Sequence, residues 1–272
     1  MFIKLEDITS FKTYRKEIKI FKEEDTVNNI LIKNGNSTID GFSYPAKKKV
    51  SFVINQGNNN IINWRETAIC PITHLSTRKR IIFHILNEYC APRFDSSIFI
   101  AENSEFSAFT KNVFKNTIFS EYLGAGYTPG SIHNNVMHQD FTKLSFVDGS
   151  IDFVLHSDVF EHIPDYLTGF KECFRVLKKG GRMIWTVPFA ANEDKNIIRA
   201  YINEQNQIIH LYPPEYHGDP LDPNGILCFR YFGWQMFEEL KNIGFREAFT
   251  LVTWSKEFCY LDDDNFVFLA IK

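Results

Sequence analysis

Hydrophobic and polar positions along the chain change their pattern near residue 96. Beyond that point, short apolar runs alternate with stretches that place apolar residues on one helical face. The apolar runs predict strands at 97–101, 116–121, 135–139, 151–157, 182–187, 249–254 and 266–271. The amphipathic stretches predict helices at 104–114, 164–178 and 234–243, with a further helix around 195–205. Strands that alternate with helices indicate an α/β fold with a mostly parallel sheet.

The first part of the chain shows short β-like runs instead, separated by turn residues at 34–36, 40–41 and 56–60. Helices are expected there only within 8–24 and at 77–88. We therefore predict a small β-rich domain over 1–75, followed by a larger α/β domain over 76–272. Residues 190–232 lie between the fifth strand and the last helix, and we expect them to form an insert over the pocket.

The composition indicates a globular protein, because 44% hydrophobic residues in a chain of 272 suffice for a large core. No apolar run approaches the roughly 20 residues of a membrane helix, and the first ten residues do not resemble a signal peptide. The five cysteines are scattered and odd in number, which fits reduced thiols better than disulfides. We expect a cytoplasmic protein with no membrane partner.

Charge is distributed unevenly along the chain. Residues 1–90 carry more basic than acidic side chains, the remainder carries more acidic ones, and the net charge is -3. A basic first part favours an anionic substrate or partner, although solvated surface lysines give the same pattern. The basic residues are not clustered as in a nucleic-acid-binding protein, so no nucleic-acid partner is expected.

Polar residues stand where the predicted strands end. The carboxyl ends of parallel strands meet at one edge of a sheet, and ligands bind in the crevice outside that edge. Chemistry is therefore expected among Glu102, Glu121, Asp140, Ser157, Asp158 and Pro188.

The most specific signal lies between residues 152 and 189. Residues 152–165 read DFVLHSDVFEHIPD, residues 174–182 read FRVLKKGGR, and residues 186–189 read TVPF. These motifs resemble the fourth strand, the next helix and the fifth strand of class I S-adenosylmethionine-dependent methyltransferases of the type 11-like superfamily. The resemblance covers residues 97–190. It implies a Rossmann-like, seven-stranded, mostly parallel sheet with an antiparallel last strand, and S-adenosylmethionine as the cofactor.

The resemblance also assigns residues to the adenosine half of the cofactor. Glu121 would hold the ribose hydroxyls, a role that its distance from the first strand also favours. Tyr122 and Leu123 would flank the adenine. Residues 137–146 resemble the third-strand motif, which places Asp140 at the adenine amino group and Phe141 beside the ring. A turn or a helix cap remains an alternative role for Asp140.

The loop after the first strand departs from the family pattern. Residues 101–108 read AENSEFSA and contain no glycine, whereas the family usually has a glycine-rich loop there. Glycines let the backbone approach a ligand closely and adopt positive φ. Glu102 would still hold the cofactor, through its ammonium group, and Ser157 and Asp158 would contribute from the fourth strand. A variant cofactor pose, weak binding and a lost site all stay open, and the chain resembles a subgroup with the same loop.

The first domain resembles a split zinc ribbon that has lost its ligands. Four thiolates close such a site, but only Cys70 is present, with Ser43, Ala46 and Thr73 at the other places. His74 is a possible nitrogen ligand, but two groups do not make a structural site. We predict no metal there, and a domain that packs through Phe42, Tyr44, Phe52, Ile54 and Trp64.

Two histidines are candidate catalytic groups. His162 follows the fourth strand, and His217 lies in the insert. Each is a possible general base, because an unperturbed imidazole titrates near pH ~6.5, and each has a structural alternative as a loop or helix-start contact.

Three hypotheses follow from the sequence. The first is an enzyme that methylates an oxygen or nitrogen of a small molecule or glycan, with a homodimer as a candidate assembly. The second is a catalytically silent binding or assembly module that keeps the fold. A nicotinamide-dependent enzyme is disfavoured, because it needs a glycine-rich helix N-terminus for the pyrophosphate.

Overall fold

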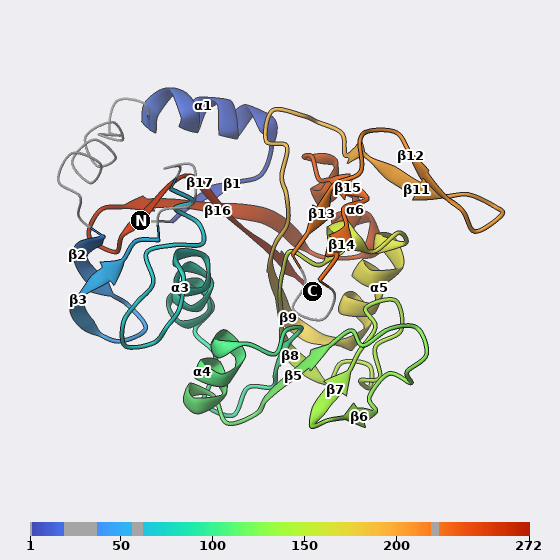
Figure 1. Cartoon of the computed structure of the whole chain (residues 1–272), viewed down its shortest axis with the longest axis horizontal. Helices are drawn as coiled ribbons and strands as arrows, with labels where there is room; N and C mark the ends of the chain where they lie inside the picture. Colours follow the sequence, from blue (N-terminus) through green and yellow to red (C-terminus); the bar gives the residue numbers. More distant parts are fainter. Residues whose placement is uncertain (1, 19–36, 56–61, 219–222) are drawn as a thin grey trace.

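The computed structural model describes residues 2–18, 37–55, 62–218 and 223–272 (Figure 1). The predicted turns at 34–36 and 56–60, and the end of the helix predicted within 8–24, lie outside these residues. A nine-stranded sheet dominates the described part of the chain. Its strands are, in spatial order, β1 (Ile3–Leu5), β16 (Glu247–Ser255), β17 (Tyr260–Ile271), β9 (Leu177–Thr186), β8 (Ile151–Ser157), β4 (Ile98–Ile100), β5 (Thr117–Glu121), β7 (Val136–His138) and β6 (Ile132–His133).

Seven of these strands form the sheet predicted from the sequence. The neighbouring pairs from β9 through β8, β4 and β5 to β7 are all parallel. The last strand, β17, is antiparallel to both β9 and β16. The predicted Rossmann-like α/β architecture is therefore confirmed. Two short antiparallel strands, β1 and β6, extend it at its edges.

Helices cover both faces of the sheet. Helices α1 (Ile8–Ile18), α5 (Tyr166–Val176) and α6 (Gln235–Ile243) bury apolar residues in one core. Helices α3 (Thr77–His84) and α4 (Glu105–Val113) bury theirs in another, across the sheet. β8 contributes Val154 to the first core and Phe153 and Leu155 to the second. A strand buried on both faces reads as an almost continuous apolar run, which explains why its bounds were predictable.

Helix α5 is shorter than predicted. Its N-cap is Asp165, whose side chain accepts a hydrogen bond from Thr168 N at 3.1 Å, and it ends at Val176. The chain then enters β9, so Gly180 and Gly181 lie inside a strand and do not stop the helix. A Cβ on Gly181 would lie 2.8 Å from Lys178 O. The two glycines therefore allow a tight bend inside β9. The bend follows from the pairing of β9 with β8, which precedes α5 in the sequence.

The helix predicted at 77–88 continues past α3 as a π-helical segment, Ile85–Cys90. The helix suggested around 195–205 is absent. Short ladders occupy the insert instead, formed by β10 (Ile197–Ile198), β11 (Ala200–Ile202), β12 (Ile208–His210), β13 (Tyr216–His217), β14 (Ile226–Leu227) and β15 (Arg230–Tyr231). Asn203 Oδ1 accepts hydrogen bonds from Gln205 N and Gln207 N, and Asn206 has φ +60°. This turn chemistry outweighs the helical pattern.

A β-hairpin of β2 (Thr38–Ser43) and β3 (Lys48–Val53) lies in the first region of the chain. Together with Trp64, this hairpin packs against Cys259 and Leu261, around the start of β17. Strand β1 and helix α1 share a sheet and a core with the larger α/β part. The domain boundary at residues 75 and 76 stays a prediction. No helix in the described ranges is long and apolar enough to cross a bilayer.

Candidate active site

The carboxyl ends of β4, β5 and β7 are joined by hydrogen bonds. Asn103 N, just after β4, donates to the Glu121 carboxylate at the end of β5 (2.7 Å). Gln139 N donates to Glu121 O (3.1 Å), and Leu123 N donates to His138 Nδ1 (3.0 Å). These contacts bring the loops that follow the three strands to one edge of the sheet.

The loop without glycines forms a helix cap. Ser104 is the N-cap of α4, and its Oγ accepts from Phe106 N (3.2 Å) and donates to Glu102 Oε1 (3.0 Å). Ser107 completes a reciprocal capping box. The Phe106 side chain is 2% exposed and packs in the core that α3 and α4 cover. The loop is therefore held by side-chain caps where the family usually has a glycine-rich backbone.

Lys79 of α3 reaches the ends of β4 and β8. Its ammonium forms an ion pair with Glu102 and donates to Ser157 Oγ at 2.9 Å. Burial lowers the pKa of Lys79, and the neighbouring Glu102 carboxylate opposes that shift. Glu102 and Ser157, two of the residues predicted to bind the cofactor, therefore both contact the Lys79 ammonium.

Asp158 is the most strongly held acid at this edge. Arg65 donates to both of its oxygens, at 2.7 and 2.8 Å, Arg78 forms a further ion pair, and Thr186 Oγ1 donates at 2.9 Å. Burial would raise the pKa of Asp158, but the two guanidinium groups outweigh it and hold the pKa well below its usual value. The residue also has φ +52°, which an aspartate tolerates better than most residues.

The residues predicted around adenine lie in different environments. Asp140 Oδ1 accepts hydrogen bonds from Thr142 N and Oγ1, both at 2.7 Å, so this oxygen caps a turn. Phe141 is 6% exposed and belongs to the core under α5, whereas Tyr122 is 52% exposed. The cofactor roles predicted for these residues stay predictions.

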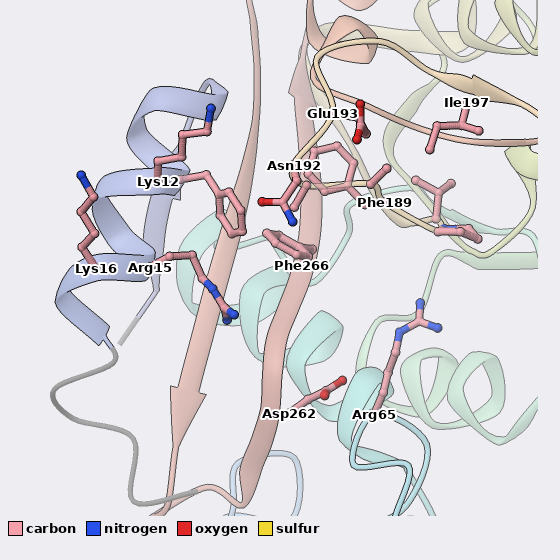
Figure 2. Close-up of a pocket in the computed structure, with 15 residues that line it drawn as sticks. Lys12, Arg15, Lys16, Arg65, Phe189, Asn192, Glu193, Ile197, Asp262 and Phe266 are labelled. Carbon is pink, nitrogen blue, oxygen red and sulfur yellow. The ribbon is translucent and has the colours of Figure 1, made fainter.

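A cavity of about 910 Å³ lies beside the carboxyl end of β9 (Figure 2). Phe11 of α1, Phe266 of β17 and Phe189 contribute its aromatic walls. Basic side chains enter from two sides, with Arg15 on α1 and Arg65 across the cavity. Arg65 is also the partner of Asp158, so the cavity adjoins the strand-end edge.

His162 and His217, distant in sequence, meet in space. Their rings pack edge to face with centroids 4.9 Å apart. His162 Nε2 and His217 Nδ1 lie 3.7 and 3.6 Å from the Glu161 Oε1 atom. Burial raises the pKa of Glu161 to about 7, and contacts with the Cys228 thiol and with Glu161 raise the pKa of His217. Antiparallel pairing of β13 with β14 brings His217 to this place.

Sequence reasoning missed several residues of this edge. Lys79, Arg65 and Arg78 belong to the first third of the chain, and no local pattern relates them to the strand ends. Glu161 stood inside the quoted fourth-strand motif, beside His162. Its position next to a candidate catalytic histidine was the sequence feature that pointed to Glu161.

The donor set at the strand ends fits S-adenosylmethionine. Glu121 lies at the end of β5, where its carboxylate would serve ribose hydroxyls, because a carboxylate accepts several hydrogen bonds, one of them here from Asn103 N. Lys79 is a cation already paired with Glu102 and Ser157, and an ammonium at this place suits the carboxylate of an amino acid.

Comparison with known proteins agrees with this fold. Residues 109–185 match the family described as "Methyltransferase domain". An uncharacterized methyltransferase of Mycobacterium sp. (strain KMS) is 33% identical over 86 residues, which are 27% of this chain and 34% of that protein. A demethylmenaquinone methyltransferase of Bacillus velezensis is 41% identical over 49 residues, 18% of this chain and 21% of that protein. The chain thus spans about a third or less of these relatives' length.

Among solved structures, an S-adenosylmethionine-dependent methyltransferase from Mesorhizobium loti aligns with 72% of this chain and 98% of its own, at 13% identity and a TM-score of 0.42. The sheet order, with its antiparallel last strand, agrees with the family match on independent grounds. Residues 109–185 of the α/β part therefore resemble a methyltransferase domain, and they lie in a sheet of the Rossmann-like type.

Proposed function

We propose that the chain transfers the methyl group of S-adenosylmethionine to an oxygen or nitrogen of a small molecule or glycan. One observation carries the proposal. The acidic strand ends adjoin a cavity of about 910 Å³, and Arg65 belongs to both, as a partner of Asp158 and as a wall of the cavity. A cofactor site and an acceptor site side by side are what methyl transfer requires, because the reacting atoms must meet.

The adenosine half of the cofactor would lie over β5 and β7. Glu121 would accept from the ribose hydroxyls, Tyr122 and Leu123 would flank the adenine with Phe141 beneath, and Asp140 would accept from the amino group. The amino-acid half would lie near β4 and β8. There, Lys79 would hold the carboxylate that backbone amides of a glycine loop usually bind, and Glu102 would face the ammonium. The bound cofactor supplies a methyl group already activated by a sulfonium.

The cavity favours an acceptor with an acidic group. Lys12, Arg15, Lys16 and Arg65 contribute basic side chains, against Glu193 and Asp262. Positive potential in a cleft raises the local concentration of anions and steers them inward. The aromatic walls would bury an apolar ring or the face of a sugar.

The chain's own residues would orient the acceptor and deal with its proton. The insert that carries His217 packs against the motif that carries His162, and would exclude water from this side. An acceptor hydroxyl must lose a proton in the reaction, and we assign that task to His162, with the ring of His217, whose pKa is raised, packed against it.

Calorimetric titration with S-adenosylhomocysteine tests the proposal. We expect saturable heat with a Kd in the micromolar range, and formation of S-adenosylhomocysteine when anionic sugars or phenols are supplied with S-adenosylmethionine. The alternative, a silent binding module, is favoured by the pairing of Glu102 with Lys79 inside the chain. Absence of heat at millimolar ligand would decide for the module.

A further inference from the structure

The Glu161 carboxylate is buried without a hydrogen-bonding partner. Glu161 lies in a 3-10 turn, Phe160–His162, after β8, and its side chain is 0% exposed. Within the described part of the chain, neither carboxylate oxygen has a hydrogen bond. A buried carboxylate without compensation is costly, so such a group in a native structure points to a positive partner.

Two imidazole nitrogens face the same oxygen. His217 Nδ1 is 3.6 Å and His162 Nε2 is 3.7 Å from Glu161 Oε1, and the three ligand atoms all lie within 4.8 Å of one another. These separations are too long for hydrogen bonds. In a tetrahedral zinc site with bonds of 2.0–2.2 Å, neighbouring ligand atoms stand about 3.4 Å apart. The spacing therefore suits three ligands around one ion.

Both histidines are held in the orientation that a metal needs. His162 Nδ1 donates to Leu227 O at 2.9 Å, which leaves the lone pair on Nε2. His217 Nε2 donates to Glu215 Oε1 at 3.0 Å, so a metal ion that displaces the other ring proton would bind the lone pair on Nδ1. A metal-bound histidine usually donates its other N–H to a carboxylate or a backbone carbonyl, and both kinds of partner are present here. Tyr231 and Arg199 in turn hold Glu215.

We propose that Glu161, His162 and His217 form a binding site for a divalent transition-metal ion, with Zn²⁺ as the best match to the donor set. Two histidines and one carboxylate, with a fourth position left open, are a ligand set of catalytic zinc sites. Cys228 lies close to His217 and Glu215 but outside this set of three, and its thiol donates to Arg230 O at 3.3 Å.

The site stands at the end of β8, three residues after Asp158, on the edge where we place methyl transfer. An ion there would polarise an acceptor oxygen and ease the loss of its proton. This role rests on the proposed function, whereas metal binding itself depends only on the three side chains. The test therefore measures binding, so that a failed metal site and a failed methyltransferase give different results.

The experiment titrates the full-length protein, first freed of metal by chelation, with Co²⁺ and then with competing Zn²⁺. We expect one equivalent of Co²⁺ to bind with visible absorption typical of a low-coordinate site, and Zn²⁺ to displace it. We expect no near-ultraviolet thiolate charge-transfer band, because Cys228 is not a ligand. Glu161→Gln and His162→Gln should each weaken Co²⁺ binding at least tenfold, and Glu215→Gln by about 10–100-fold through lost orientation of His217.

His210→Gln is the matched control, because this histidine is exposed on the same insert, and its affinity should equal that of the wild type. Circular dichroism of each variant checks the fold, and three separate substitutions keep the test decisive if one of them unfolds. The proposal is overturned if the wild type binds no Co²⁺, if the folded Glu161 and His162 variants bind as tightly as the wild type, or if a thiolate band appears.

Discussion

The guanidinium of Arg65 donates two hydrogen bonds, of 2.8 and 2.7 Å, to the two carboxylate oxygens of Asp158. This fork joins the segment after the first hairpin to the end of β8. It also holds Arg65, a lining residue of the cavity, at the place where the cavity adjoins the strand ends. Because both groups are only partly exposed, water screens the pair less than it screens an ion pair at the surface.

A double-mutant cycle with Arg65→Ala and Asp158→Asn should give a coupling free energy of about 1–2 kcal/mol in urea unfolding at pH 7. The same cycle on the more exposed pair of Lys4 and Glu247 should give about 0.5 kcal/mol or less. The low pKa of Asp158 stabilises the fold above the unfolded value near ~3.9, and this contribution is lost as pH falls below it. Equal coupling in both pairs would contradict the account.

Arg80→Met should lower the free energy of unfolding by about 3 kcal/mol. The side chain is 0% exposed and donates to the backbone carbonyls of Phe258, Cys259 and Ala68. Methionine keeps the packing volume but leaves these buried acceptors unpaired. Guanidinium-induced unfolding measures the loss, and Arg93→Met, at an exposed arginine, should change it by less than about 0.5 kcal/mol. If Arg80→Met lowers the free energy of unfolding as little as Arg93→Met does, the three carbonyls have other hydrogen-bond donors, and the account of Arg80 is wrong.

Lys79→Met should weaken binding of S-adenosylhomocysteine by about tenfold or more. We place the ligand carboxylate against this ammonium, and a hydrogen bond between charged groups contributes about 1.5–3 kcal/mol. Calorimetry checks the change, with Lys111→Met on the exposed side of α4 as the control. Tighter binding in the Lys79 variant would show instead that the lysine blocks the site.

Stability should fall as pH drops from about 6.5 towards 4, partly through His84. Its ring is buried and stacks on Tyr44 at 3.7 Å, and burial lowers its pKa to about 4. In the unfolded chain the group takes up a proton near pH ~6.5, so in this window protonation favours unfolding, by at most ~1.4 kcal/mol per pH unit. Urea unfolding at pH 7.5 and 5 tests this. His84→Gln should reduce the dependence, whereas the exposed-site variant His210→Gln should retain it.

Glu121→Ala should weaken S-adenosylhomocysteine binding by about 1–3 kcal/mol, through loss of hydrogen bonds from both ribose hydroxyls to a charged acceptor. Glu105→Ala, at an exposed acid in the first turn of α4, should bind like the wild type. Unchanged affinity in the Glu121 variant would rule out the ribose contact.

The sequence predicted the sheet well because its central strands are buried on both faces. The strand predicted at 151–157 is centred on the apolar residues Phe153, Val154 and Leu155, and β8 has those bounds. The C-terminal end of α5 was harder to predict, because Leu177 joins β9 by pairing with a distant strand. The ladders of the insert were mistaken for a helix, because the turn at Asn203 and Asn206 outweighs a short apolar pattern.

The candidate site was only partly predictable. Residues such as Glu121 and Asp158 follow strands, so the topology alone places them at one edge. The cations that pair with these acids come from α3 and the segment before it, and only tertiary packing reveals them. The approach of His217 to Glu161 likewise depends on the pairing of β13 with β14, which no local pattern encodes.

The most direct test of the account is the electron density of a crystal soaked with S-adenosylhomocysteine. We predict an adenosyl group beside Glu121 and Asp140, with its ribose hydroxyls on the Glu121 carboxylate and its amino-acid carboxylate near Lys79. The opposite result is a crystal in which Lys79 and Glu102 remain paired and no ligand density appears at saturating concentration. That result would contradict the enzymatic function and leave only the fold.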